Sequence, residues 1–314
     1  MLKFILGRSI RTLVVVAIAT GAIFFMVRSL PGDPAQALLG QDASAEALEG
    51  MRRTLMLDRS PVEQYFAWLS QVVQGELGYS YRSRQPVTGV VAQAFPVSLT
   101  LLVFAMAWAT LFAIVLGTVA AYWRGQWPDT IISTFTAILY GVPSFWLGLL
   151  LIIGFALTLR WFPTGGYVPF GRDAGEALRS IALPALTLGS ALAGALSRFV
   201  RASVMETLSR DYVTTARAKG VKELSVVRRH VLRNSLIPVI TVLGIQMGAV
   251  LGGAVVIEVV FNLPGLGRLV VDAVRSRDYP VLQGGLLVLM AWFALVNLAV
   301  DIAYGLLDPR VRAA

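Results

Sequence analysis

Six long apolar segments constrain the fold of this chain more than any other feature of its sequence. They are residues 10–30, 97–121, 130–158, 180–200, 234–263 and 284–306. A helix needs about 20 mostly apolar residues to cross the hydrocarbon core of a bilayer. Charged residues make up only 14% of the chain, against about 25% in soluble domains. We therefore expect an all-α integral membrane protein with six transmembrane helices, folded as one domain over residues 1–314.

The first apolar segment follows a short basic head, as the core of a secretory signal peptide would. The segment is long, however, and no small-residue cleavage site follows it. A cleaved signal has a shorter apolar core and such a site. We therefore interpret residues 10–30 as a retained transmembrane helix.

The distribution of Lys and Arg predicts the orientation. With a cytoplasmic N-terminus, the cytoplasmic segments hold 13 Lys and Arg residues in 58 positions, and the opposite segments hold 11 in 107. Short cytoplasmic loops of membrane proteins carry an excess of Lys and Arg. We therefore expect both termini in the cytoplasm, and the net charge of +9 needs no nucleic-acid partner.

Missing residue types exclude several kinds of site. The chain has no Cys and a single His, His230. Disulfides and Cys-ligated metals are thus excluded, and His-clustered metals and Ser–His–Asp catalysis are disfavoured. The sequence also lacks a Gly-x4-Gly-Lys-Ser/Thr phosphate-binding loop. We expect no enzymatic activity, metal or cofactor in this chain itself.

The only large hydrophilic excursion outside the apolar segments is the outer insertion, residues 31–96, with five Arg against seven Asp and Glu. Ser60, Pro61 and Glu63 form the pattern of a capping box with proline at the first helical position. An apolar face recurs behind them at helical spacing, and it consists of Val62, Phe66, Leu69, Val73 and Leu77. Gly75 and Gly78 are stop signals. We interpret the insertion as a helical cap on the outer membrane face.

An aromatic and basic stretch, Tyr79 to Arg84, follows this helix. It either belongs to the cap or meets an external partner or substrate. Under the second hypothesis the contact residues are Tyr79, Tyr81 and Arg82.

The densest basic charge lies in the predicted cytoplasmic loop 201–233, where eight of 33 residues are Arg or Lys. Gly220 predicts the end of a first short helix, and Glu206 and Arg210 are spaced to pair. One helix face would combine Met205, Leu208, Tyr212, Thr215 and Ala216. A second stretch has an apolar stripe of Leu224, Val227 and Val231. Composition leaves two interpretations open: a docking knob for a soluble partner, or a determinant of topology.

Several residues within the apolar segments are candidates for the path or for a subunit interface. Small residues allow helices to approach closely in lipid, and they recur at Gly244, Gly248 and Gly252 and at Gly189, Ala193 and Ser197. Packing within the chain explains these equally well. Pro143 predicts a disturbed helix at Gly141-Val142-Pro143. Glu258 is an acid near a span end and a candidate site residue, whereas we expect Asp301 to be structural.

Residues Thr214 to Gly220, followed after nine residues by His230-Val231-Leu232-Arg233, resemble the EAA loop of binding-protein-dependent ABC importer permeases. The family pattern is Glu-Ala-Ala, three residues, Gly, nine residues, then Ile-x-Leu-Pro. This chain keeps Ala216, Gly220 and Leu232, and departs at Thr214, Thr215, His230 and Arg233. The variant DYVTTARAKG…RRHVLRNSLIPV is similar to the dipeptide/oligopeptide branch. So are LPGDP, YGVPSFWLGLLLI and VVIEVVFNLPGLGRLVVDAVRSRDYPVLQG, which extend the resemblance over nearly the whole chain.

The resemblance implies a type I ABC importer permease fold, in the first of two paralogous permeases of a bacterial or archaeal cytoplasmic membrane. Such a subunit forms half of the pathway for peptides or related small solutes. Its partners would be a second homologous permease, two ATP-binding subunits that carry ATP and Mg, and an extracytoplasmic solute-binding protein. The ATPase-coupling residues would be Tyr212, Thr214, Thr215, Ala216, Arg217, Ala218, Lys219 and Gly220.

The resemblance also gives the weaker candidates a role. Tyr79, Tyr81 and Arg82 would meet the binding protein or substrate. The translocation path or permease interface would include Pro143, Gly244, Gly248, Gly252 and Glu258. The alternative is a secondary transporter or channel driven by an ion gradient. That class shows repeated halves and midplane ionisable residues, and neither is visible here.

Overall fold

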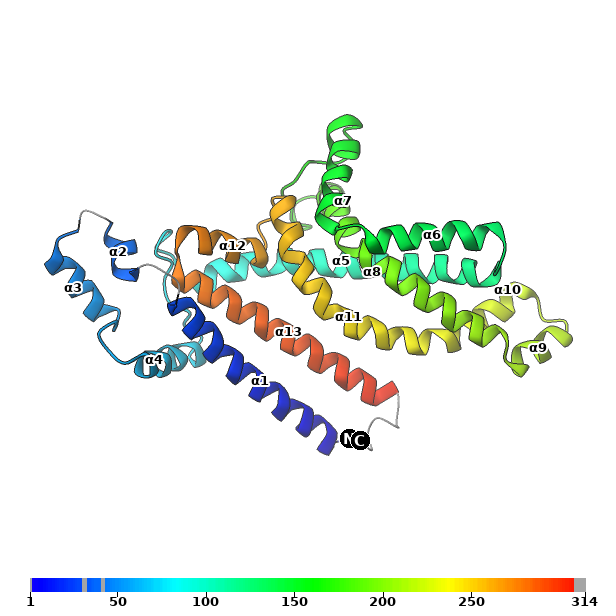
Figure 1. The fold of residues 1–314 in the computed structure, drawn as a ribbon, viewed down its shortest axis with the longest axis horizontal. Coiled ribbons are helices and arrows are strands. Elements are labelled where there is room, and N and C mark those ends of the chain that lie inside the picture. The colour runs from blue at the N-terminus through cyan, green and yellow to red at the C-terminus, as the bar shows by residue number, and fades with distance from the viewer. Residues whose placement is uncertain (1, 30–32, 41–42, 308–314) are drawn as a thin grey trace. The chain divides into compact units, whose positions relative to one another are not determined.

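The computed structural model describes residues 2–29, 33–40 and 43–307, and the regular elements in these ranges are helices (Figure 1). The first elements are α1 (Leu2–Arg28), α2 (Pro34–Leu39), α3 (Ala45–Thr54), α4 (Pro61–Val73), α5 (Val87–Tyr122), α6 (Trp127–Gly141), α7 (Ser144–Leu151) and the π-helix η1 (Ile152–Thr158). The rest are α8 (Ala174–Leu208), α9 (Asp211–Ala218), α10 (Glu223–Ser225), the π-helix η2 (Val226–Leu232), α11 (Arg233–Val260), α12 (Leu266–Ser276) and α13 (Tyr279–Leu307). The predicted all-α membrane fold is confirmed.

Five helices are long and apolar enough to cross a membrane within the described residues. Their candidate spans are Leu6–Arg28, Val87–Tyr122, Ala174–Leu208, Val242–Val260 and Tyr279–Ile302. A sixth span results if the bent pair of α6 with α7 and η1 counts as one. Each of the six predicted apolar segments corresponds to one of these. The helices α5 and α8 extend well beyond the predicted apolar segments, α5 at its N-terminal end and α8 at both ends.

The bent pair is the largest departure from simple spanning helices. The axes of α6 and of α7 with η1 differ by 105°, and Figure 1 shows α7 turning away from α6. Val142 lies between them in an extended conformation, with φ −79° and ψ 129°. A residue before proline is pushed out of the helical region, and Pro143 has no N–H to continue the helix. The predicted disturbance is confirmed, as a full break.

The chain forms two compact units. Unit 1 comprises Met1–Ser98 and Pro264–Leu298, and unit 2 comprises Leu99–Leu263 and Ala299–Ala314. In unit 1 the start of α5 packs with α12 and the start of α13 around a buried cluster that includes Val87, Val91, Leu266, Tyr279 and Leu282. In unit 2 the long helix α8 is the most buried element and packs against α6, α7 and α11.

The outer insertion in unit 1 is helical, as predicted. The capping box of Ser60 and Glu63 begins α4, and Gly75 and Gly78 follow its end with φ of 85° and 84°. The predicted apolar face is not covered by other parts of unit 1, because Val62, Phe66 and Val73 are 56–81% exposed. The larger aromatic side chains of Tyr65 and Trp68 pack instead on Phe24 of α1, with ring centroids 5.4 and 5.5 Å from it.

The small residues of α8 serve packing within unit 2. A Cβ on Gly189 would lie 2.5 Å from Trp108 Nε1, and one on Gly194 would lie 2.5 Å from the carbonyl oxygen of Thr136. A Cβ on Gly244 of α11 would collide with Val300. Gly189 and Gly244 therefore allow close packing within the chain, and the assignment of Gly244 to the path or permease interface stays a prediction.

Candidate coupling site and outer turn

The helix α9 is seated in the core of unit 2. Val213 is fully buried and Ala216 is 9% exposed. They belong to one cluster with residues of α5, α8, η2 and α11, namely Ala113, Ala121, Leu196, Val200, Val204, Val226, Val231 and Val239. The other coupling candidates on α9 (Tyr212, Thr214, Thr215, Arg217 and Ala218) are exposed. One face of α9 is therefore anchored to the membrane helices, and the opposite face is available to a partner.

The helix face predicted across residues 205–216 is partly wrong. Met205 and Leu208 pack on the cluster, but α8 ends at Leu208, so α9 starts with a new direction. Tyr212 and Thr215 consequently face outward. The hydroxyl of Tyr212 accepts a hydrogen bond from Asn234 Nδ2 at 3.1 Å.

Gly220 ends α9 through a Schellman motif. Its N–H donates to the carbonyl of Arg217 (2.9 Å), and the N–H of Val221 donates to that of Ala216 (3.3 Å). Gly220 has φ of 76°, and a Cβ there would meet no atom within 4 Å. Glycine is therefore favoured here by the left-handed backbone conformation. The surroundings would leave room for a larger side chain. The predicted helix stop is confirmed.

An ion pair stabilises the turn around Gly220. Arg217 donates from Nη2 to Glu223 Oε1 at 2.7 Å and from Nε to Oε2 at 3.2 Å, which links α9 to α10. The hydrogen bonds that Arg217 donates to Glu223 raise the pKa of Arg217 above its ordinary value. The predicted pair of Glu206 and Arg210 is also present, at 2.5 Å.

The predicted stripe after Gly220 is confirmed at Val231 and wrong at Leu224 and Val227. Val226 and Val231 are fully buried, whereas Leu224 is 70% exposed and Val227 only partly buried. The segment forms the π-helix η2, in which hydrogen bonds join residues five apart. This wider turn places positions 226 and 231 on one face.

A partly buried ion pair that the sequence analysis missed joins the start of α6 to α8 in unit 2. Asp129 at the start of α6 accepts two hydrogen bonds of 2.7 Å from Arg201 of α8, in bidentate geometry. Its carboxylate also accepts from the Gly125 N–H (3.0 Å) and the Ser133 hydroxyl (3.1 Å). The side chains of Asp129 and Arg201 are 9% and 31% exposed. The available signal was that Asp129 is the only acid in residues 122–129.

The weaker path candidates lie on different elements of unit 2. Pro143 precedes α7 at the helix break. Gly248 is partly buried on α11, and Gly252 is exposed there with no atom within 4 Å of a Cβ. Glu258, in the last turns of α11, is 1% exposed. Their assignment to the path or the permease interface stays a prediction.

The stretch from Tyr79 to Arg84 forms a tight turn in unit 1. The Ser80 N–H donates to the Gln85 carbonyl, and the Val87 N–H donates to that of Gly78, both at 2.9 Å. Asp278, 4% exposed, holds the turn. Its carboxylate accepts from the Ser80 hydroxyl (2.5 Å) and from the N–H groups of Tyr81 (3.1 Å) and Arg82 (3.3 Å).

The three contact candidates in this turn differ in exposure. Tyr79 is 66% exposed and Arg82 is exposed. Tyr81 packs against Tyr279, with ring centroids 6.4 Å apart, and burial raises its pKa to about 12. The side chains of Tyr79 and Arg82 are thus accessible to another protein, whereas that of Tyr81 packs inside unit 1. Sequence reasoning missed Asp278, since nearly 200 residues separate it from the turn.

Replacing Asp278 with Ala is expected to loosen the outer turn. The substitution removes the acceptor of three hydrogen bonds, and each buried donor left unpaired costs about 1–3 kcal/mol. The amides of residues 81 and 82 should then exchange with deuterium about tenfold faster, as measured by mass spectrometry of the peptide that contains them. The control is Glu76→Ala, which removes an exposed carboxylate nearby. Equal exchange in the two variants would contradict the role of Asp278.

Comparison with known proteins identifies the family. Residues 113–313 match the family described as binding-protein-dependent transport system inner membrane component. Residues 1–102 match the N-terminal family of the membrane components of such systems. A structural comparison also matches a chain from a crystal structure of an amino acid ABC transporter with histidines. The TM-score is 0.49 at 15% identity, covering 71% of this chain and 94% of that one.

Curated relatives match over the full length. The glutathione transport system permease protein GsiC of Escherichia coli O6:H1 (strain CFT073) is 43% identical over 312 residues, which cover 99% of both chains. The protein of the same name from Escherichia coli strain K12 is 42% identical over the same length and share. Both family matches and both relatives agree with the permease resemblance and with its type I importer fold. The chain therefore belongs to the family of binding-protein-dependent transport system inner membrane components, and it is the permease component of an ABC importer.

Proposed function

We propose that this permease carries glutathione or short peptides of similar size and charge, as one half of a pathway completed by a second homologous permease. Two ATP-binding subunits would supply ATP and Mg, and an extracytoplasmic binding protein would deliver the solute. The substrate class is supported by full-length relatives named as glutathione transport permeases.

The observation that carries the proposal is the packing of α9 against the membrane helices. Its exposed face ends at Gly220, and its buried face contributes Val213 and Ala216 to a cluster shared with α5, α8 and α11. Packed cores transmit displacement with little compression. A push on α9 by an ATPase subunit would therefore move these three membrane helices together, as a rigid-body change of access requires.

The outer turn would serve the opposite side of the membrane. With the N-terminus in the cytoplasm, Tyr79 and Arg82 face the side from which a binding protein delivers solute. An exposed tyrosine beside an arginine is a common anchor pair in protein interfaces. Asp278 keeps the two in a fixed orientation, which lowers the entropy lost on docking.

Single-cysteine labelling tests the orientation, since the natural chain has no cysteine. In intact cells, a membrane-impermeant maleimide should label Arg82→Cys and leave Lys219→Cys unlabelled until the membrane is opened. Labelling of Lys219→Cys from outside would contradict both the topology and the coupling role of α9.

Transport is tested with the full complex in proteoliposomes. Uptake of radiolabelled glutathione should require ATP, the binding protein and both permeases. Uptake by this chain alone without nucleotide would instead support a gradient-driven transporter. A complex that transports an unrelated solute and excludes glutathione would contradict the substrate class only.

A further inference from the structure

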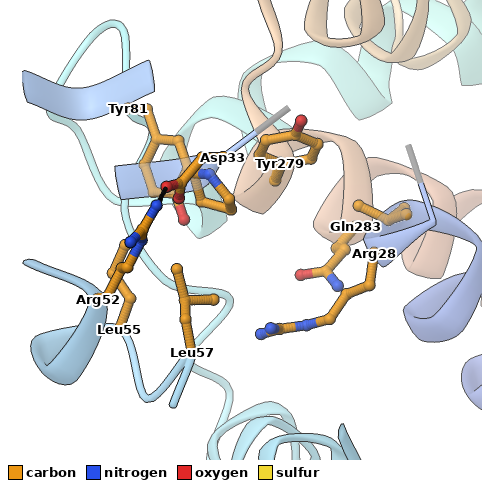
Figure 2. A pocket seen from close by; sticks show the side chains of 10 residues that line it. Arg28, Asp33, Arg52, Leu55, Leu57, Tyr81, Tyr279 and Gln283 are labelled. Atoms are coloured by element: carbon orange, nitrogen blue, oxygen red, sulfur yellow. Dashed lines mark hydrogen bonds and ion pairs between the residues drawn. The ribbon is translucent and has the colours of Figure 1, made fainter. Parts of the chain in front are cut away.

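A pocket of about 460 Å³ lies in unit 1, where the C-terminal end of α1 meets the outer turn and the start of α13. Figure 2 shows Asp33 and Arg52 on one side of it, and Arg28 and Gln283 on the other. The volume falls in the range of sites for small molecules.

The pocket carries an excess of positive charge. Asp33 and Arg52 neutralise each other, with Arg52 Nη2 and Nε at 2.6 and 2.9 Å from Asp33 Oδ2. Arg28 is accessible, and no carboxylate of the described residues lies within ion-pair distance of it. Its guanidinium carbon lies 4.9 Å from the centroid of the Phe24 ring, and Figure 2 shows the group reaching into the open space.

Two neutral donors accompany this charge. Gln283 is 9% exposed, and its amide lies beside Arg28 in Figure 2 without a hydrogen bond to another described residue. Tyr81 lines the pocket as well, and its pKa of about 12 keeps the hydroxyl protonated. Arg28, Gln283 and Tyr81 together suit a ligand with one negative charge and several acceptor oxygens.

The position of Arg28 along α1 places the pocket at the membrane surface. The apolar span Leu6–Arg28 has 23 residues, and at 1.5 Å per residue it is about 34 Å long. The hydrocarbon core of a bilayer is about 30 Å thick. Arg28, the last residue of this span, therefore lies at the level of the lipid headgroups, where basic and aromatic residues gather.

The helix α4 packs against the part of α1 that precedes Arg28. Its Tyr65 hydroxyl is 3.2 Å from the Thr20 hydroxyl of α1, eight residues or about 12 Å of helix before Arg28. Val62, Phe66 and Val73 of α4 remain exposed. A helix with such a face lies at the boundary of headgroups and acyl chains. The exposed Phe25 and Met26 of α1 continue this apolar surface toward the pocket.

We propose that the pocket binds the phosphate of a phospholipid headgroup, with Arg28 as the ionic contact and Gln283 and Tyr81 as hydrogen-bond donors. The acyl chains lie along the exposed apolar residues of α1 and α4. The lipid belongs to the leaflet opposite the N-terminus. Its bound headgroup holds the outer insertion and the turn that carries Tyr79 and Arg82 at a fixed height. The site is independent of the transported solute.

Native mass spectrometry of the assembled transporter, titrated with palmitoyl-oleoyl phosphatidylglycerol, tests the site. Arg28→Gln should weaken retention of the lipid by fivefold to tenfold, as expected for the loss of one basic contact. Gln283→Glu should weaken it as well, because the new carboxylate pairs with Arg28 in place of the phosphate. The matched control is Arg53→Gln on α3, whose side chain is 76% exposed and outside the pocket. Equal retention in the Arg28 and Arg53 variants overturns the proposal.

Two further arms identify the source of the anion. The lipid-loaded complex is exposed to millimolar inorganic phosphate and, separately, to glutathione. Failure of both to displace the lipid supports a headgroup site. Displacement by either one, lost in Arg28→Gln, shows a site for a soluble anion and overturns the assignment to lipid. Elution of each variant as an intact complex on size exclusion shows that folding and assembly are preserved.

Discussion

Ala218→Trp should reduce solute uptake at least tenfold while leaving the complex assembled and its basal ATPase activity intact. Ala218 is exposed on α9, one residue before the cap that leads into Gly220, and it is not part of the buried cluster. A tryptophan there adds a large side chain to the surface that would enter the groove of an ATPase subunit. If the new side chain displaced α9 from that groove by a few ångströms, closure of the ATPase subunits would no longer move the membrane helices. The measurements are solute uptake and the increase in ATP hydrolysis on addition of solute-loaded binding protein. Both should fall in Ala218→Trp.

Substitutions at two neighbouring positions separate coupling from folding. Ala218→Ser keeps a small side chain and should transport normally. Ala216→Trp should lose both transport and stability, because Ala216 is 9% exposed in the cluster and overpacking a core costs about 1–3 kcal/mol. Gly220→Pro should also uncouple, since proline cannot adopt a φ of 76°. Normal stimulation of ATPase activity in Ala218→Trp would contradict the coupling role of α9.

Asp129→Ala should lower the free energy of unfolding by about 2 kcal/mol, the largest loss that we expect from removing a single charge here. The substitution removes the acceptor of four hydrogen bonds and leaves Arg201, which is only partly exposed, without its partner. Arg201 would then remain between α6 and α8, and the Gly125 N–H would lose its acceptor. The measurement is the midpoint of thermal unfolding of the assembled complex in detergent.

A matched arginine and a double variant test whether the ion pair itself is responsible. Arg198→Met removes an exposed charge one turn earlier on α8 and should change stability by less than about 0.5 kcal/mol. Asp129→Ala combined with Arg201→Met should recover much of the loss, because it leaves no buried charge. A loss in Asp129→Ala no larger than that in Arg198→Met would refute the importance of the pair.

Local signals in the sequence predicted the elements that depend on neighbouring residues only. The six apolar segments, the capping box at Ser60 and the helix stop at Gly220 are each encoded within a few positions. The break at Pro143 follows from the missing N–H and from steric restriction of Val142. For this reason these features agree with the structure.

The side of a short helix that becomes buried was not predictable in the same way. On α4 the apolar stripe of Val62, Phe66 and Val73 stays exposed, whereas Tyr65 and Trp68 pack on an aromatic partner of α1 that the periodicity did not indicate. Beyond Gly220 the π-helix shifts the buried positions to Val226 and Val231. In both places tertiary contacts decided between faces of similar hydropathy.

The sequence by itself determined that this chain is a helical membrane protein with a basic loop interrupted by a helix-ending glycine, because hydrophobicity and local backbone preference act over short stretches. Only the tertiary structure decided how that loop is held and what supports the outer turn. Arg201 meets Asp129 across 72 residues, and Asp278 meets Ser80 across 198. Such pairs are chosen by the packing of whole helices, which brings distant polar groups together where water cannot satisfy them.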